Sequence, residues 1–221
     1  MLLVEVAALF VLMPVAAMGW PLSPLLVESL VVVVVAVVLV VSQSRTAIAV
    51  ALVSMGFVAV GGAMRVLHPS PLTNWISHVG SIVGLSTVTW VILRAVFAAG
   101  PINLHRIQGA VVVYLNVAII FTSAYRLLVE SVPDAFHGIP DDILPVHGNS
   151  PRLVAMLVYY SFTTLTSTGY GDVVPLHPFA RSLSNFEAII GQLYPATLLA
   201  RVVTLELEFR RQRRRGGEER D

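Results

Sequence analysis

The chain has 221 residues, of which 56% are hydrophobic and 12% are charged, and its formal net charge is +1. A soluble core cannot bury this much apolar surface, so the composition excludes an ordinary soluble domain and predicts an all-α integral membrane protein. The sequence contains no cysteine, which excludes a disulfide framework and a thiolate metal site. A charge so close to neutral gives no reason to expect a nucleic-acid partner.

The first part of the chain consists of apolar stretches of membrane-spanning length. A hydrocarbon core of roughly 30 Å requires about 20 apolar residues in a helix. On that measure, spans are expected at 2–19, 24–43, 46–66 and 77–99. The first stretch lacks the basic start of a secretory signal peptide, so we interpret it as a retained span. The four spans define a predicted N-terminal transmembrane domain over residues 1–100.

Two more spans are expected at 107–129 and 178–206, separated by a long connection. The first part of that connection, residues 130–151, is rich in Pro, Gly and Asp. This composition predicts an exposed segment without regular structure, which we call the turret. Ser150 can then cap a helix that begins at Pro151 and continues for about four apolar turns. Such a helix is too short to cross a bilayer, so a re-entrant helix is predicted.

The C-terminal residues 208–221, EFRRQRRRGGEERD, contain six arginines. Under the positive-inside rule this places the C-terminus in the cytoplasm, and six spans place the N-terminus there as well. The segment is predicted to be a basic cytoplasmic tail that anchors the last span and binds anionic lipid head groups. Residues 101–207 form the second predicted domain, which contains both later spans and the re-entrant helix.

The re-entrant helix is followed by the segment TSTGYGD at residues 166–172. Non-helical backbone at membrane depth is tolerated only where it is buried in protein or lines a water-filled path. Gly169 and Gly171 alternate with other residues, and glycine enters left-handed backbone conformations without steric cost. Successive carbonyl groups could then point in one direction, and several copies around an axis would form rings of oxygen able to replace the hydration shell of a cation.

The segment TSTGYGD, preceded by YYSFTTL and followed by a long apolar helix, resembles the pore signature of the bacterial-type potassium channel family over roughly residues 150–206. This resemblance implies a homotetramer of six-span subunits, with K⁺ as the permeant ion and no cofactor. It implies that the ion-coordinating row is Ser167, Thr168, Gly169, Tyr170 and Gly171.

The resemblance also implies roles for residues around the filter. Asp172 would lie at the outer mouth, and Tyr159 and Tyr160 would brace the filter from behind, with Tyr170 pointing into that aromatic layer. Glu187 lies near filter depth and is expected to pair with Arg181 or to hydrogen-bond the pore helix.

The last span contains a predicted bend. Pro195 cannot donate a backbone hydrogen bond to the carbonyl of Gly191, and its ring crowds that carbonyl, so a kink is expected between the two residues. Gly191 also occupies the position of the hinge glycine of the family, which implies a gate. A statically kinked helix is the alternative.

Six spans with a pore loop resemble the voltage-gated superfamily, whose fourth span carries regularly spaced arginines. The expected span 77–99 contains only Arg94, so weak or no voltage dependence is predicted. The first four spans are therefore interpreted as scaffold. Five acidic side chains are expected to attract cations to the outer mouth: Glu130, Asp134, Asp141, Asp142 and Asp172.

The sequence thus predicts a passive potassium-selective channel in the plasma or inner membrane, and it contains no pattern typical of an enzyme. The family usually has threonine where this chain has Ser167, and valine or isoleucine where it has Thr168, so a poorly selective cation channel is an alternative. A potassium transporter and a non-conducting membrane scaffold are further alternatives. The single GYG argues against the transporter, because the related transporters carry four pore loops in one chain.

Overall fold

A computed structural model of the chain describes residues 2–12, 70–98, 104–140 and 150–218, with single positions at 14, 15, 18, 49, 52, 53, 56, 60 and 143. The expected spans 24–43 and 46–66 therefore lie outside the described residues, apart from five of the single positions. Of the expected span 2–19, the described part is a helix that continues as one π-helical segment.

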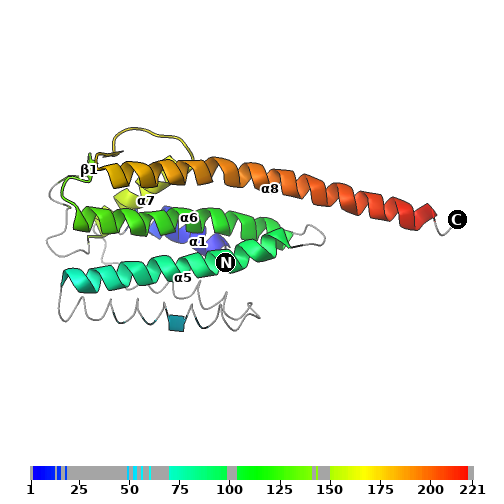
Figure 1. Ribbon diagram of the computed structural model, residues 1–221, viewed down its shortest axis with the longest axis horizontal. Coiled ribbons are helices and arrows are strands. Elements are labelled where there is room, and N and C mark those ends of the chain that lie inside the picture. Colours follow the sequence, from blue (N-terminus) through cyan, green and yellow to red (C-terminus); the bar gives the residue numbers. More distant parts are fainter. Residues whose placement is uncertain are drawn as a thin grey trace.

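The described residues are mostly helical, and the long helices run side by side in Figure 1. The elements are α1 (Leu2–Ala7), the π-helix η1 (Ala8–Leu12), α5 (Pro71–Phe97), α6 (Leu104–Ser131), β1 (Phe136–His137), α7 (Pro151–Leu165), β2 (Val174–Pro175) and α8 (Pro178–Glu218). The shorter helix α7 packs against both α6 and α8.

Helix starts follow the local sequence signals. Ser70 and Thr73 form a reciprocal capping box at the start of α5, where Pro71 occupies the first turn. The Ser150 hydroxyl accepts a hydrogen bond from the Leu153 amide at 3.4 Å, and α7 begins at Pro151 as predicted. Both caps satisfy an amide that has no partner within the helix, and proline is tolerated there because its missing N–H is not needed.

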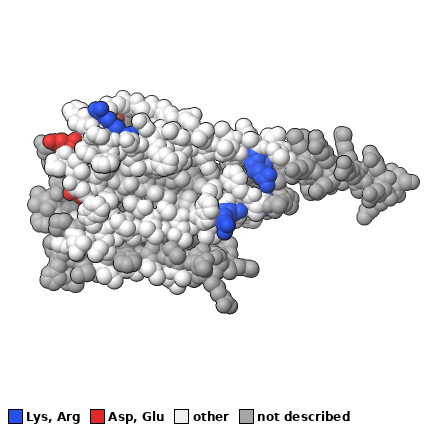
Figure 2. All heavy atoms as spheres, in the orientation of Figure 1, with Lys and Arg blue, Asp and Glu red and all other residues white. Residues whose placement is uncertain are grey.

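Two of the described helices, Leu72–Phe97 and Leu104–Ser131, are long and apolar enough to cross a membrane. They correspond to the expected spans 77–99 and 107–129. Figure 2 shows acidic and basic side chains at one end of the visible face, further basic side chains towards the other end, and a broad uncharged band between them. That distribution fits a bilayer core around the band.

Helix α8 runs from Pro178 to Glu218 and is therefore longer than the expected span, which ended at residue 206. The helix projects beyond the other elements in Figure 1. Arginine has a high helix propensity, so the Arg-rich segment continues the helix instead of ending it. Residues 208–218, which belong to the predicted tail, are helical.

The turret was expected to lack regular structure, and for its first residues this prediction is wrong. Strand β1 pairs antiparallel with β2, with Phe136 opposite Pro175 and His137 opposite Val174. The Ala135 carbonyl also accepts the Leu176 amide at 2.9 Å. The sequence signal missed this pairing because each strand has two residues and its partner is remote in the chain.

Glu130 was expected at the outer mouth, and this prediction is also wrong. Its side chain is only 8% exposed and accepts hydrogen bonds from His78 at 3.1 Å and from Arg126 at 3.1 Å. His78 belongs to α5, so the three side chains connect α5 to α6. A buried carboxylate requires such partners, which explains why Glu130 faces the neighbouring helix instead of solvent.

The pore loop as candidate functional site

Residues 167–171, the predicted ion-coordinating row, are called the filter here, and they are attached to the last turn of α7. The Ser167 amide donates to the Thr164 carbonyl at 2.9 Å, and the Thr168 and Gly169 amides both donate to the Thr163 carbonyl, at 2.8 and 3.2 Å. These bonds use the carbonyls that a helix leaves without intrahelical partners at its C-terminal end. The chain therefore leaves the helix in a defined direction, and the position of α7 determines the position of the filter.

The filter backbone alternates in conformation. Ser167, Gly169 and Gly171 have φ values of 56°, 56° and 79°, while Thr168 and Tyr170 between them do not have positive φ. A left-handed residue at every second position is the pattern that a one-sided row of carbonyl groups requires. The sequence predicted left-handed backbone for the two glycines. No sequence signal indicated left-handed backbone at Ser167, because a serine rarely has positive φ.

All residues from Thr166 to Asp172 are exposed in the single chain. A Cβ atom added at Gly169 or Gly171 would meet nothing within 4 Å. Tyr170 is 71% exposed, although it is a large aromatic residue. The subunit thus covers the filter from behind and leaves its other side open.

The two tyrosines expected to brace the filter point in different directions. The Tyr159 ring stacks on Tyr170, with a centroid distance of 6.1 Å and an interplanar angle of 3°. Tyr160 is buried against Tyr125 and Phe136, and its hydroxyl lies 2.6 Å from that of Ser184. Tyr159 therefore contacts the filter directly, whereas Tyr160 fixes the pore helix to its neighbours. Adjacent residues on a helix project about 100° apart, so they cannot share one face.

The hydroxyl of Thr168 is engaged behind the filter. Thr166 donates its hydroxyl hydrogen to the Phe162 carbonyl at 2.7 Å, and the Thr166 and Thr168 hydroxyl oxygens lie 2.8 Å apart. Since Thr166 has only one hydroxyl hydrogen, Thr168 is the donor in this pair. Thr168 stands where the family that this chain resembles usually has valine or isoleucine. Its hydroxyl group therefore has a hydrogen-bond partner within its own subunit.

Glu187 lies at the centre of a polar network between three helices. Its side chain is fully buried and accepts hydrogen bonds from Tyr125 of α6 and Ser161 of α7, both at 2.5 Å. Of the two expected arrangements, the structure has the bond to the pore helix. Arg181 donates instead to the Pro175 carbonyl at 3.1 Å. The network fixes the rotation of α7 relative to α6 and α8.

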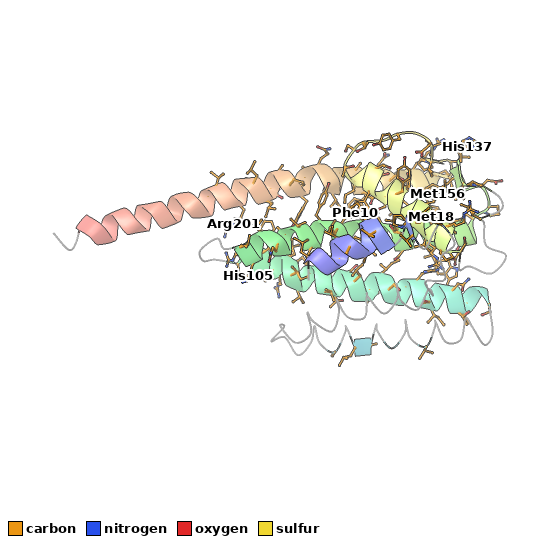
Figure 3. The ribbon with its side chains drawn as sticks, turned by 180° about the vertical axis from the view of Figure 1, so that it is seen from behind. Phe10, Met18, His105, His137, Met156 and Arg201 are labelled. Carbon is orange, nitrogen blue, oxygen red and sulfur yellow. The ribbon has the colours of Figure 1, made fainter. Side chains whose placement is uncertain are left out.

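The outer end of the filter is held by its own carboxylate and by the turret. Asp172 accepts the Val173 amide at 3.0 Å. Gly138, directly after β1, has a φ of 88°, and a Cβ atom added there would lie 1.9 Å from the Asp172 carbonyl oxygen. Figure 3 shows His137 of β1 at this end of the molecule and Arg201 of α8 near His105, far from it.

We expect Gly138→Ala to disturb the outer end of the filter selectively. The new Cβ would force the turret away from a backbone atom, and the positive φ would be strained, at a combined cost of about 2 kcal/mol. Thermal unfolding of the solubilised protein should show a lower melting temperature, while size-exclusion chromatography shows an unchanged elution volume. An unchanged melting temperature would mean that the turret does not support the filter segment.

The two residues of the predicted gate lie within one continuous helix. Pro195 is inside α8, which the described residues extend without interruption on both sides of it. Gly191 is buried, and a Cβ atom added there would lie 1.8 Å from the Leu165 carbonyl oxygen at the end of α7. Close packing is therefore one reason for glycine at this position, and bending during gating stays a prediction.

Among the described residues, no group of His, Asp and Glu side chains is arranged to hold a metal ion. This is compatible with a site made of backbone carbonyls, because such a site needs no acidic cluster.

Comparison with known proteins finds a similarity for the part of the chain that contains the pore loop. Residues 145–207 match the family model Ion_trans_2, which is described as an ion channel. The match contains α7, the filter and α8 as far as residue 207. Neither a curated protein nor a solved structure matches the chain. The match covers less than a third of the chain, and over residues 145–207 it supports an ion-channel pore domain.

Proposed function

We propose that this chain is the subunit of a homotetrameric potassium-selective channel that conducts K⁺ passively down its electrochemical gradient. The observation that carries the proposal is the alternation of left-handed residues at Ser167, Gly169 and Gly171 in an exposed segment at the end of α7. One such strand supplies ligands on one side of an ion only. A ring needs several copies around a symmetry axis, and four are used in carbonyl filters of this kind.

Potassium selectivity is supported by the way in which the filter is held. Tyr170 stacks on Tyr159, and Thr168 donates its hydroxyl to Thr166, so these side chains turn towards the supporting protein. The carbonyl row Ser167 to Gly171 then remains as the set of ion ligands. A poorly selective cation channel is the alternative outcome of the experiment below.

Voltage is proposed to have little influence on opening. Helix α5 contains one arginine, Arg94, which lies over the ring of Trp90 at 5.7 Å. Four such charges crossing a field of 100 mV completely would contribute only roughly 9 kcal/mol, and a position near the helix end crosses a small part of the field. The N-terminal domain over residues 1–100 then acts mainly as scaffold.

The proposed topology has six spans in the plasma or inner membrane, with both chain ends in the cytoplasm. Arginines of the tail at 208–221 would lie at the inner leaflet and contact anionic head groups. The pore domain would occupy residues 101–207.

The proposal is tested by measuring K⁺ flux and reversal potential in liposomes that contain the purified full chain. We expect K⁺-selective current in the wild type and none in Gly169→Ala. A side chain at this left-handed position is unfavourable by about 1–2 kcal/mol, so the variant would lose the backbone conformation that aligns the carbonyl groups. Gly109→Ala in α6 is the control, since a Cβ there meets only side-chain atoms of Val96 and Ile92. Equal currents of Na⁺ and K⁺ would leave a general cation channel, and a wild type without current would contradict the proposal.

A further inference from the structure

The inner end of the filter receives a hydrogen bond from α8. The Gln192 side-chain amide donates to the Ser167 hydroxyl oxygen at 2.7 Å, although the two residues are 25 positions apart. Both side chains lie on the open side of the subunit, where the filter is exposed. Neither residue type predicts this contact from the sequence.

The backbone around Gln192 is held in place on both sides. Gly191 lies directly against the Leu165 carbonyl. The Tyr194 ring stacks on Tyr114 at 6.0 Å, and its hydroxyl donates to the Ala110 carbonyl at 2.9 Å. Residues 191–194 therefore form a rigid base from which the Gln192 amide reaches the filter.

The contact constrains what the Ser167 hydroxyl can do. Gln192 occupies one of the two lone pairs of this oxygen, which limits rotation of the hydroxyl and leaves the second lone pair for another partner. Ser167 also has positive φ, so its backbone is held in a conformation that serine rarely adopts. The Thr168 hydroxyl is oriented by its bond to Thr166 of the same loop, whereas the Ser167 hydroxyl is oriented from α8.

We propose that Gln192 is a positioning residue that orients the Ser167 hydroxyl as a ligand of the innermost cation site, and thereby sets the affinity of that site. The inference rests on the proposed function, because the site is complete only when the filter is surrounded by its copies. The ligand class is a dehydrated cation of the size of K⁺. Ba²⁺ is a suitable probe, because it has nearly the same radius and twice the charge.

The test is a double-mutant cycle with Gln192→Met and Ser167→Ala, read out as block of K⁺ current by Ba²⁺ from the cytoplasmic side. Met keeps the length of the side chain and removes the amide donor, and Ala removes its acceptor. We expect Gln192→Met to raise the Ba²⁺ concentration for half block about fivefold, the effect of one hydrogen bond of about 1 kcal/mol, and Ser167→Ala, which removes the ligand itself, to raise it at least as much. The double variant should show no further change, because Gln192 acts through Ser167. Gln108→Met in α6 is the matched control, and its K⁺ current should be half blocked at the same Ba²⁺ concentration as that of the wild type.

A second measurement does not depend on conduction. Titration calorimetry of Ba²⁺ into the detergent-solubilised full chain should show the same loss of affinity in Gln192→Met. Unchanged Ba²⁺ affinity in this variant, or additive effects in the double variant, would overturn the inference while leaving a conducting wild type as a channel. A wild type that neither conducts nor binds Ba²⁺ would overturn both the inference and the proposed function.

Discussion

Gly191→Ala is expected to destabilise the pore domain far more than the same change at Gly109 in α6. The new Cβ would lie 1.8 Å from the Leu165 carbonyl oxygen and 2.7 Å from the carbonyl carbon. Both are backbone atoms, so α8 would have to move away from α7. We expect the free energy of unfolding to fall by about 3 kcal/mol, which corresponds to a melting temperature lower by about 6 °C or more. Thermal unfolding of the solubilised protein measures this shift.

Gly109→Ala is the matched control for this prediction, because it adds the same methyl group to another helix. Its Cβ would lie 3.1 Å from the Val96 Cγ2 atom, which belongs to a side chain that can shift. Alanine also has a higher helix propensity by about 1 kcal/mol, so the two effects nearly cancel. If Gly191→Ala melts like this control but changes channel opening, Gly191 acts as a hinge and its close packing is of minor importance.

Glu187→Leu is expected to abolish K⁺ flux, although Glu187 is not placed among the ion ligands. Leucine would leave the Tyr125 hydroxyl without its acceptor, while Ser161 would keep its second contact, the Ala118 carbonyl at 2.8 Å. An unsatisfied buried hydroxyl costs about 1–3 kcal/mol, and the rotation of α7 would no longer be fixed by the network. Flux in liposomes and thermal unfolding together measure the two effects.

Glu187→Gln separates hydrogen bonding from charge. Glutamine keeps one oxygen that can accept from the Tyr125 hydroxyl, and its NH2 group can donate to the Ser161 hydroxyl oxygen. Both hydroxyl groups therefore keep a hydrogen-bond partner. We expect this variant to keep most of the flux and to melt within a few degrees of the wild type. Equal loss in the Gln and Leu variants would show that the negative charge, and not the network geometry, is what the pore requires.

Local patterns in the sequence predicted the helices that position the site. The apolar lengths at 77–99 and 107–129 indicated α5 and α6, because span length follows from the thickness of a bilayer. Ser150 and Pro151 indicated where α7 begins, because a cap satisfies amides within one turn. The glycines of GYG indicated left-handed backbone, because only glycine adopts it without cost.

Only the tertiary structure decided which side chains meet. Glu130 is paired with His78, which is 52 positions away, and Ser161 is bonded to Glu187, which is 26 positions away. The left-handed conformation of Ser167 accompanies a contact with Gln192 from another helix.

Residue type and spacing describe a single element, so the sequence by itself determined a membrane composition, the approximate positions of α5 and α6 and a pore-loop motif. Helix rotation and the partners of buried polar groups depend on how separate elements pack, because each buried group must find its hydrogen bond in whatever neighbour lies within reach. For that reason the contact of Gln192 with Ser167 became visible only in the folded chain, and only the structure decided between the two partners expected for Glu187.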